Sequence, residues 1–238
     1  MRRRHGKKKH FRTLLIAGHP RCGTGYAADL CGQLGLDVGH EKLGKDGISS
    51  WMFAVDADDN PYALDAAART RRALAWKHLL MPVRDLATAV GSVMRDSAHA
   101  PPSYNFRREH ILRLTGLDLD TLATPLERAV RSVTAWARIV LAQHPDLCFR
   151  IEDPPERLRE FLIGAGLCPP ERRALRLDTT PVNADKPYQG VRHPNPEVDA
   201  AAWQALPAAT RAEIAWYCAS FGYADPAAAK TAATKALT

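Results

Sequence analysis

A glycine-rich loop near the N-terminus has the residue types and spacing of a phosphate-binding loop. The stretch LLIAGHPRCGTGYAADL runs from an apolar segment through glycines into a helical pattern. A strand, a glycine loop and a helix in this order direct backbone N–H groups and the positive end of the helix dipole at an anion. Gly18 and Gly23 have the separation of the glycines in G-x-x-x-x-G-K-[ST], but Thr24 and Gly25 replace its Lys and Ser/Thr. The loop therefore predicts phosphate binding without the lysine and Mg²⁺-binding hydroxyl of ordinary ATP and GTP hydrolysis, and Arg21 is the cation that remains in it.

An arginine and a serine later in the chain predict a second phosphate site. Arg84 ends an apolar segment, and Ser92 lies eight residues further on, on the expected next helix. A guanidinium binds phosphate through forked, charge-assisted hydrogen bonds, and a hydroxyl adds a single bond. Two such sites fit a nucleotide with separated phosphates, an adenosine with a 5′-phosphate group and a 3′-phosphate, better than ATP.

Alternating strands and helices are expected to position these residues. Such alternation predicts a three-layer α/β fold, with a mostly parallel central sheet covered by helices on both faces. Ligands of such sheets collect at the carboxyl ends of the strands. Residues 44–51 and 96–117 are expected to be loop or irregular, and Trp51 either stacks on an acceptor or packs in the core. The apolar patterns predict strands over 12–18, 36–41, 75–83 and 147–153, and helices over 24–34, 85–95, 125–144, 155–166 and 203–223.

Composition indicates one folded domain with a charged extension. The chain has 238 residues, of which 46% are hydrophobic, enough for one full core. Seven basic residues and no acid lie between positions 2 and 12, so subtracting 7 from the 33 Lys and Arg leaves 26, which equals the 26 Asp and Glu. We predict a basic disordered arm over 1–11, a single domain over 12–224 and an alanine-rich tail over 225–238. The arm is interpreted as a solvated tail, with RNA or anionic lipid as the alternative partners.

The cysteines and the hydropathy pattern indicate a cytoplasmic protein. No apolar run is long enough to span a membrane, and the run after the basic arm is too short for a signal peptide. Cys22 lies in the glycine loop, where it is either a nucleophile or a small lining residue, and the second interpretation is favoured. The five cysteines contain no C-x-x-C pair, which indicates neither a disulfide framework nor a zinc site: Cys22, Cys31, Cys148, Cys168 and Cys218.

The two phosphate motifs resemble those of the sulfotransferases that use 3′-phosphoadenosine-5′-phosphosulfate (PAPS), including bacterial members. The 5′-phosphosulfate loop of that family commonly reads [KR]-[SGC]-G-[ST] after a strand, which is similar to the RCGT that begins at Arg21. The family's 3′-phosphate motif is an arginine and a serine eight positions apart, as in Arg84 and Ser92. The resemblance covers most of the chain, from residue 14 to residue 223.

A third motif of the family is a late basic loop that closes over the nucleotide. The segment KPYQGVRHP is similar to it, although not in perfect register, and its Lys186 is a weaker candidate for the same role. The resemblance therefore implies nucleotide contacts from Arg21, Cys22, Gly23, Thr24, Gly25, Tyr26, Arg84, Ser92, Gly190 and Arg192.

The resemblance implies a P-loop NTPase-like sulfotransferase fold and a defined reaction. A sulfuryl group would pass from PAPS to a hydroxyl of a glycan, glycolipid or small metabolite, releasing 3′-phosphoadenosine-5′-phosphate (PAP) without a metal. Arg21 would stabilise the charge on the leaving phosphate, and the acceptor hydroxyl needs a general base. Glu41 resembles the glutamate base of some branches, while His40 is either the base itself or the group that orients Glu41. The alternative is that this pair only ends a strand and binds solvent.

Two other classes of function stay open. A P-loop kinase or phosphotransferase would have the same order of strands and helices, but it needs the missing lysine and Mg²⁺ ligands. A nucleotide-fold protein could instead bind nucleic acid through the basic arm, although no specific nucleic acid is expected as a partner. The sequence specifies neither the acceptor nor the oligomeric state.

Overall fold

Five parallel strands form the central sheet of the protein, which is described here from a computed structural model covering residues 10–72, 74–180 and 187–228. The order across the sheet is β2-β3-β1-β4-β5. All four neighbouring pairs are parallel, which confirms the predicted α/β class with a parallel sheet. The strands are β1 His10–Ile16, β2 Val38–His40, β3 Gly47–Ser49, β4 Leu74–Val83 and β5 Leu147–Arg150.

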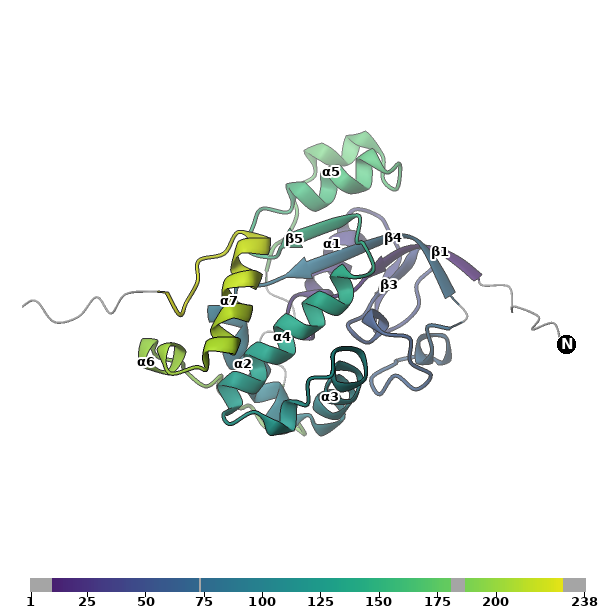
Figure 1. The fold of residues 1–238 in the computed structure, drawn as a ribbon. Helices are drawn as coiled ribbons and strands as arrows, with labels where there is room; N and C mark the ends of the chain where they lie inside the picture. The colour runs from purple at the N-terminus through teal and green to yellow at the C-terminus, as the bar shows by residue number, and fades with distance from the viewer. Residues whose placement is uncertain (1–9, 73, 181–186, 229–238) are drawn as a thin grey trace, which may run out of the picture.

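Helices cover both faces of the sheet (Figure 1). Successive residues of β1 point to opposite faces: Leu15 belongs to the core with α2, α4 and α7, whereas Leu14 and Ile16 belong to the core with α1 and α5. The helices are α1 Thr24–Gln33, α2 Leu86–His99, α3 Pro101–Thr115, α4 Pro125–Leu141, α5 Glu156–Gly164, α6 Ala200–Gln204 and α7 Ala208–Phe221. Single 3₁₀ turns lie at Met52–Ala54, Ala66–Arg69, Leu119–Thr121 and Pro170–Ala174.

The structure corrects the expectation that residues 44–51 are only loop. They contain β3, which lies between β1 and β2, and all three of its residues are buried. A Cβ at Gly47 would overlap the carbonyl oxygen of Leu14, so a glycine is required where β3 approaches β1. Three residues are too few to show a period, which is why sequence patterning misses this strand. Trp51 packs in the core against Phe106 and Trp136, with ring centroids 5.3 and 6.1 Å away.

The structure also corrects three helical assignments. The segment 96–117, expected to be irregular, contains α3, which begins with Pro101 and ends before Gly116 in the left-handed conformation. The predicted helix 203–223 is divided at Pro207 into α6 and α7. The helix predicted over 85–95 continues as α2 to His99.

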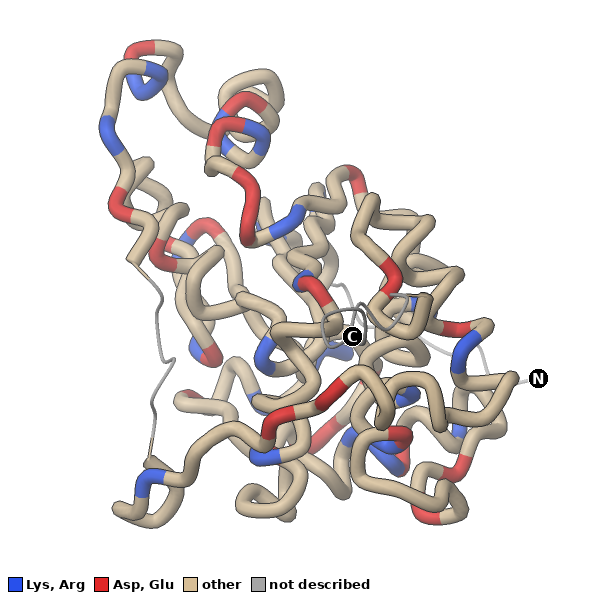
Figure 2. The backbone as a smooth tube through the Cα atoms, turned by 90° about the vertical axis from the view of Figure 1, so that its left-hand side faces the viewer, with Lys and Arg blue, Asp and Glu red and all other residues tan. Residues whose placement is uncertain are grey.

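The first strand begins inside the segment predicted to be a basic arm. β1 starts at His10, whereas the arm is predicted over 1–11, and residues 1–9 lie outside the described chain. Figure 2 shows basic and acidic residues interspersed over the described backbone. None of the helices in the described ranges is both long and apolar enough to cross a membrane.

Candidate functional site

The loop between β1 and α1 presents backbone donors at the carboxyl edge of the sheet. Gly23, the N-cap residue of α1, has φ 96°, and a Cβ there would lie 2.5 Å from Cγ2 of Ile151. A glycine is therefore required for this turn. The helix has no side-chain cap, and within the described chain no group accepts a hydrogen bond from the backbone N–H groups of Thr24, Gly25 and Tyr26. Uncapped N–H groups at a helix N-terminus form an anion-binding site.

The two predicted phosphate motifs meet beside this loop. Arg21 has φ 69°, and its Nε donates a hydrogen bond to Ser92 Oγ at 2.7 Å. Nη1 of Arg84 donates to the Arg21 carbonyl oxygen at 3.2 Å, and Nε of Arg84 donates to Thr88 Oγ1 at 3.3 Å. The hydroxyl of Tyr217 donates a hydrogen bond to the Arg84 carbonyl oxygen at 2.9 Å. Arg21, Arg84 and Ser92 thus form one cluster, in which Ser92 contacts the loop arginine directly.

Thr88 is a member of this cluster that the motif did not include. It lies four residues before Ser92 on α2, so both hydroxyls occur on one face of the helix. A search for Ser or Thr at a four-residue spacing from Ser92 would have found it.

His40 and Glu41 lie at the carboxyl end of β2, next to the first turn of α1. Nε2 of His40 is 3.4 Å from Thr24 Oγ1 and 3.7 Å from Glu41 Oε1. Glu41 has φ 56° and is buried, and its Oε2 accepts a hydrogen bond from Ser50 Oγ. A left-handed conformation costs a non-glycine residue about 1–3 kcal/mol and is found most often at functional sites. The structure therefore brings the two candidate bases to the loop between β1 and α1, the predicted phosphate loop (residues 17–23).

A buried polar network that is not predicted from the sequence connects this loop to α3 and α4. Arg107 on α3 is fully buried, and its Nη2 lies 2.8 Å from Asp96 Oδ2. Its Nη1 contacts Ser132 Oγ and His19 Nε2, both at 3.2 Å. Nδ1 of His19 lies 2.6 Å from the Pro20 carbonyl oxygen. Because arginine only donates hydrogen bonds, His19 is the neutral tautomer with its proton on Nδ1.

The ionisation of His19 agrees with this assignment. Burial, followed by the charge of Arg107, lowers the pKa of His19 well below its ordinary value of 6.5. His19 is thus a neutral acceptor between the loop and α3. No local motif could reveal it, since its partners lie 88 and 113 residues away in the sequence.

The late loop packs against α2 through Tyr188. Backbone hydrogen bonds of 2.9 Å in both directions join Tyr188 to Val191, and the two residues between them have positive φ, as in a tight hairpin turn. The Tyr188 hydroxyl donates to Asp96 Oδ1 at 3.2 Å. Burial and Asp96 raise the pKa of Tyr188, and the charge of Arg21 opposes that rise. The late loop therefore contacts α2 through the hydrogen bond between Tyr188 and Asp96.

The predicted residues of the late loop are placed differently. Gly190 and Arg192 are exposed at and after the turn, and among the described contacts neither touches the phosphate loop. His193, in contrast, stacks on His99 of α2 with ring centroids 3.6 Å apart, and its carbonyl oxygen accepts a hydrogen bond from Arg95. Lys186 lies outside the described residues.

Cys22 is buried in the hydrophobic core, with 1% of its surface exposed. Burial raises the pKa of its thiol to about 12, so the thiol is protonated at neutral pH and a poor nucleophile. All five cysteines are free thiols. Across the described ranges, His, Cys, Asp and Glu side chains form no group of three that could hold a metal ion.

Comparison with known proteins found no relative of this chain. The chain matches no protein-family model, no curated protein and no solved structure. Its function is therefore inferred from the cluster of Arg21, Arg84 and Ser92, the uncapped N-terminus of α1, and the His40–Glu41 pair.

Proposed function

We propose that the protein is a PAPS-dependent sulfotransferase with a P-loop-like fold. The observation that carries the proposal is the meeting of two arginines, two hydroxyls and an uncapped helix N-terminus at one edge of the sheet. Arg21 and Arg84 are joined through the Arg21 carbonyl oxygen, while Ser92 and Thr88 approach them from α2. The arrangement suits an anion with two separated phosphate groups.

The 5′-phosphosulfate would bind at the N-terminus of α1. The backbone N–H groups of Thr24, Gly25 and Tyr26 would donate to its oxygens, and the guanidinium of Arg21 would add charged donors. Binding of the phosphosulfate would compete with the Arg21–Ser92 hydrogen bond, and release of Ser92 would leave its hydroxyl available to the 3′-phosphate near Arg84.

The reaction is an in-line displacement at sulfur. The acceptor oxygen forms a bond to sulfur as the bond between sulfur and the bridging phosphate oxygen breaks, and PAP leaves with the electron pair. Donors fixed beside that bridging oxygen stabilise the growing negative charge, which is the role of Arg21 and the loop N–H groups. The proton of the acceptor hydroxyl passes to a base on the protein.

Glu41 is the preferred base and His40 the alternative. Ser50 fixes one oxygen of the Glu41 carboxylate, while the other lies 3.7 Å from His40 Nε2. His40 in turn reaches Thr24 in the first turn of α1. In the proposed complex the pair would lie next to the transferring group. The acceptor would carry its hydroxyl on a glycan, glycolipid or small metabolite.

Calorimetry with three nucleotides tests the donor site. PAP is expected to bind much more tightly than AMP or ATP, since it alone carries a separate 3′-phosphate. Transfer of radiolabelled sulfate from PAPS to a panel of hydroxyl acceptors, with EDTA present, tests the chemistry. Equal affinities for the three nucleotides would contradict the proposal. ATP-dependent phosphoryl transfer that stops in EDTA would instead indicate a kinase.

A further inference from the structure

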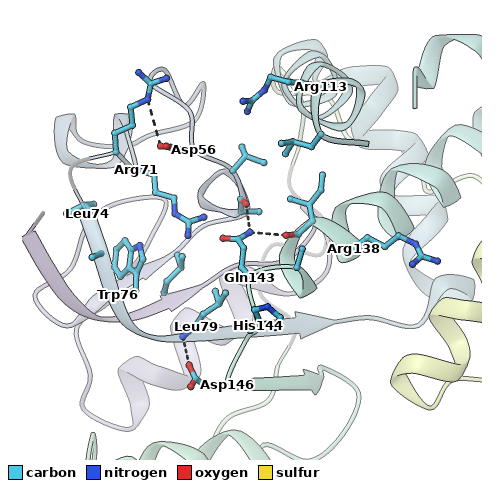
Figure 3. Close-up of a pocket in the computed structure, with 18 of the residues that line it drawn as sticks. Asp56, Arg71, Leu74, Trp76, Leu79, Arg113, Arg138, Gln143, His144 and Asp146 are labelled. Atoms are coloured by element: carbon cyan, nitrogen blue, oxygen red, sulfur yellow. Dashed lines mark hydrogen bonds and ion pairs between the residues drawn. The ribbon is translucent and has the colours of Figure 1, made fainter. Parts of the chain in front are cut away.

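A hollow of the described structure lies away from the phosphate loop, at the amino-terminal ends of the strands (Figure 3). It has a volume of about 900 Å³ and is bounded by the first half of β4, the C-terminal ends of α3 and α4, and residues 54–56. The phosphate loop follows the carboxyl end of β1, so the hollow is separate from the proposed donor site.

The charged residues that line the hollow leave an excess of positive charge. Of its two acids, Asp146 accepts a hydrogen bond from the Leu79 N–H at 2.8 Å and lies 3.8 Å from His78. The other, Asp56, lies 3.9 Å from Arg72, which also pairs with Asp58 at 2.6 Å.

Among the basic residues, Arg138 is engaged outside the hollow by Glu213 at 2.9 Å and by the ring of Trp216. The cations that remain are Arg71, Lys77 and Arg113, and Arg113 also contacts the Nδ1 atom of His110. His144 adds a further nitrogen base at the rim.

Arg71 is the basic residue best placed to bind a ligand. Figure 3 shows its side chain reaching into the hollow. Burial lowers the pKa of its guanidinium, and the charge of Asp56 only partly opposes this effect. In the described chain its hydrogen bond is to the Phe53 carbonyl oxygen, through Nη1 at 2.5 Å, although a guanidinium has five N–H donors. A partly buried guanidinium with further N–H donors can bind an anion through charge-assisted hydrogen bonds.

Apolar residues line the hollow near Arg71. Trp76 presents its indole ring, and its buried Nε1–H has no hydrogen-bond acceptor among the described residues. Leu74, Leu79 and Ile139 belong to the same apolar lining. We propose that this hollow is a second ligand site, which binds a small organic anion whose acidic group pairs with Arg71 and whose planar apolar body packs on Trp76.

Titration with naphthalene-2-sulfonate, followed by ¹H–¹⁵N NMR of the tryptophan indoles, tests the site. The chain has five tryptophans, and Trp76→Phe identifies the Trp76 signal. Saturable movement of that signal is expected, with at least tenfold weaker binding of the uncharged 2-naphthalenemethanol. Arg71→Gln should weaken binding of the sulfonate at least tenfold. The matched control Arg69→Gln, an exposed arginine two residues earlier that does not line the hollow, should change the affinity less than twofold.

Two further measurements keep the result independent of folding defects and of the donor site. Ala142→Leu narrows the hollow without removing a charge and should weaken the sulfonate severalfold, while PAP binding is unchanged in both this variant and Arg71→Gln. The proposal is overturned if the Trp76 signal moves without saturation, if Arg71→Gln binds the sulfonate as well as the unchanged protein, or if PAP displaces the sulfonate. Failure of PAP binding alone would overturn the proposed function and leave this site standing.

Discussion

Replacing Asp96 by Asn should destabilise the protein far more than the same change at a surface ion pair. The carboxylate accepts three hydrogen bonds, from Arg107, Ser103 and Tyr188. An asparagine would keep the shape, but its NH₂ group would face at least one of these donors. The side chain of Arg107 has 0% exposure and that of Asp96 has 10%, so the substitution leaves a buried guanidinium without its negative partner. Breaking a buried pair in this way costs about 3–5 kcal/mol.

A neighbouring ion pair supplies the matched control. Arg108, next to Arg107 on α3, pairs with Asp118 at 3.3 Å, and the two side chains are 39% and 31% exposed. Asp118→Asn makes the same chemical change at the surface, where an ion pair contributes about 0–1 kcal/mol. Asparagine also preserves the cap that Asp118 provides to the turn Leu119–Thr121.

Urea unfolding of the unchanged protein and its variants at neutral pH, followed by circular dichroism, measures the difference in stability. Asp96→Asn should lower the free energy of unfolding by about 3–5 kcal/mol, which corresponds to a midpoint lower by roughly 1 M or more. Tyr188→Phe, which removes only the late-loop hydrogen bond, should cost about 1 kcal/mol. If Asp96→Asn and Asp118→Asn lower the stability equally, the assignment of Asp96 as the counter-charge of a buried arginine is refuted.

Four further outcomes are expected. Arg84→Ala should weaken PAP binding by on the order of 2–3 kcal/mol in calorimetry and leave AMP nearly unaffected; equal losses for both would contradict a 3′-phosphate site. Glu41→Gln should lower sulfuryl transfer by about 10²–10⁴ with little change in nucleotide affinity, and a larger loss in His40→Ala, with the pH dependence removed, would assign the base to His40. The pKa of His19 is lowered in the folded state, so the unfolded chain binds more protons below about pH 6.5, and the free energy of unfolding should fall as the pH drops below that value; a His19→Asn variant that keeps the full slope would refute this. With its pKa raised to about 12, Cys22 should resist iodoacetamide at pH 8 until urea unfolds the protein, and rapid alkylation of the folded chain, seen by mass spectrometry, would contradict its burial.

The sequence predicts the elements whose burial is regular. β1, β4 and α4 are confirmed because each carries apolar residues in a run or at helical spacing, and each packs by those residues. α3 is missed for the opposite reason. Its inward-facing positions include Ser103, Arg107 and His110, so it shows no apolar stripe although these side chains are buried. A helix that packs by a polar network is invisible to a hydrophobic pattern.

The sequence predicts the residues of the candidate site better than the contacts between them. The glycine loop, Arg84, Ser92 and the His40–Glu41 pair all lie at the expected edge, since each follows a parallel strand and such strand ends converge. The spacing of Arg84 and Ser92 could not show that Ser92 contacts Arg21, 71 residues away in the sequence. Arg21 makes that contact from a left-handed backbone conformation. A sequence does not reveal this conformation where the residue is not a glycine.

Three side chains on one face of α2 each contact a different arginine, and the three arginines have different roles. Thr88, Ser92 and Asp96 follow one another at four-residue spacing, and they contact Arg84, Arg21 and Arg107 respectively. The equal spacing puts them on one face of the helix, while their chemistry differs.

Only the last of the three α2 positions carries a charge. A carboxylate neutralises the guanidinium that it binds, whereas a hydroxyl accepts a hydrogen bond and leaves the positive charge in place. Asp96 therefore makes Arg107 a structural residue of the core. Thr88 and Ser92 orient Arg84 and Arg21 without cancelling their charge, which is the arrangement that an anion-binding site requires. Exchanging Ser92 for Asp should accordingly neutralise Arg21 and abolish PAP binding, while Ser92→Ala, which removes only the hydroxyl, should weaken it by about 1 kcal/mol.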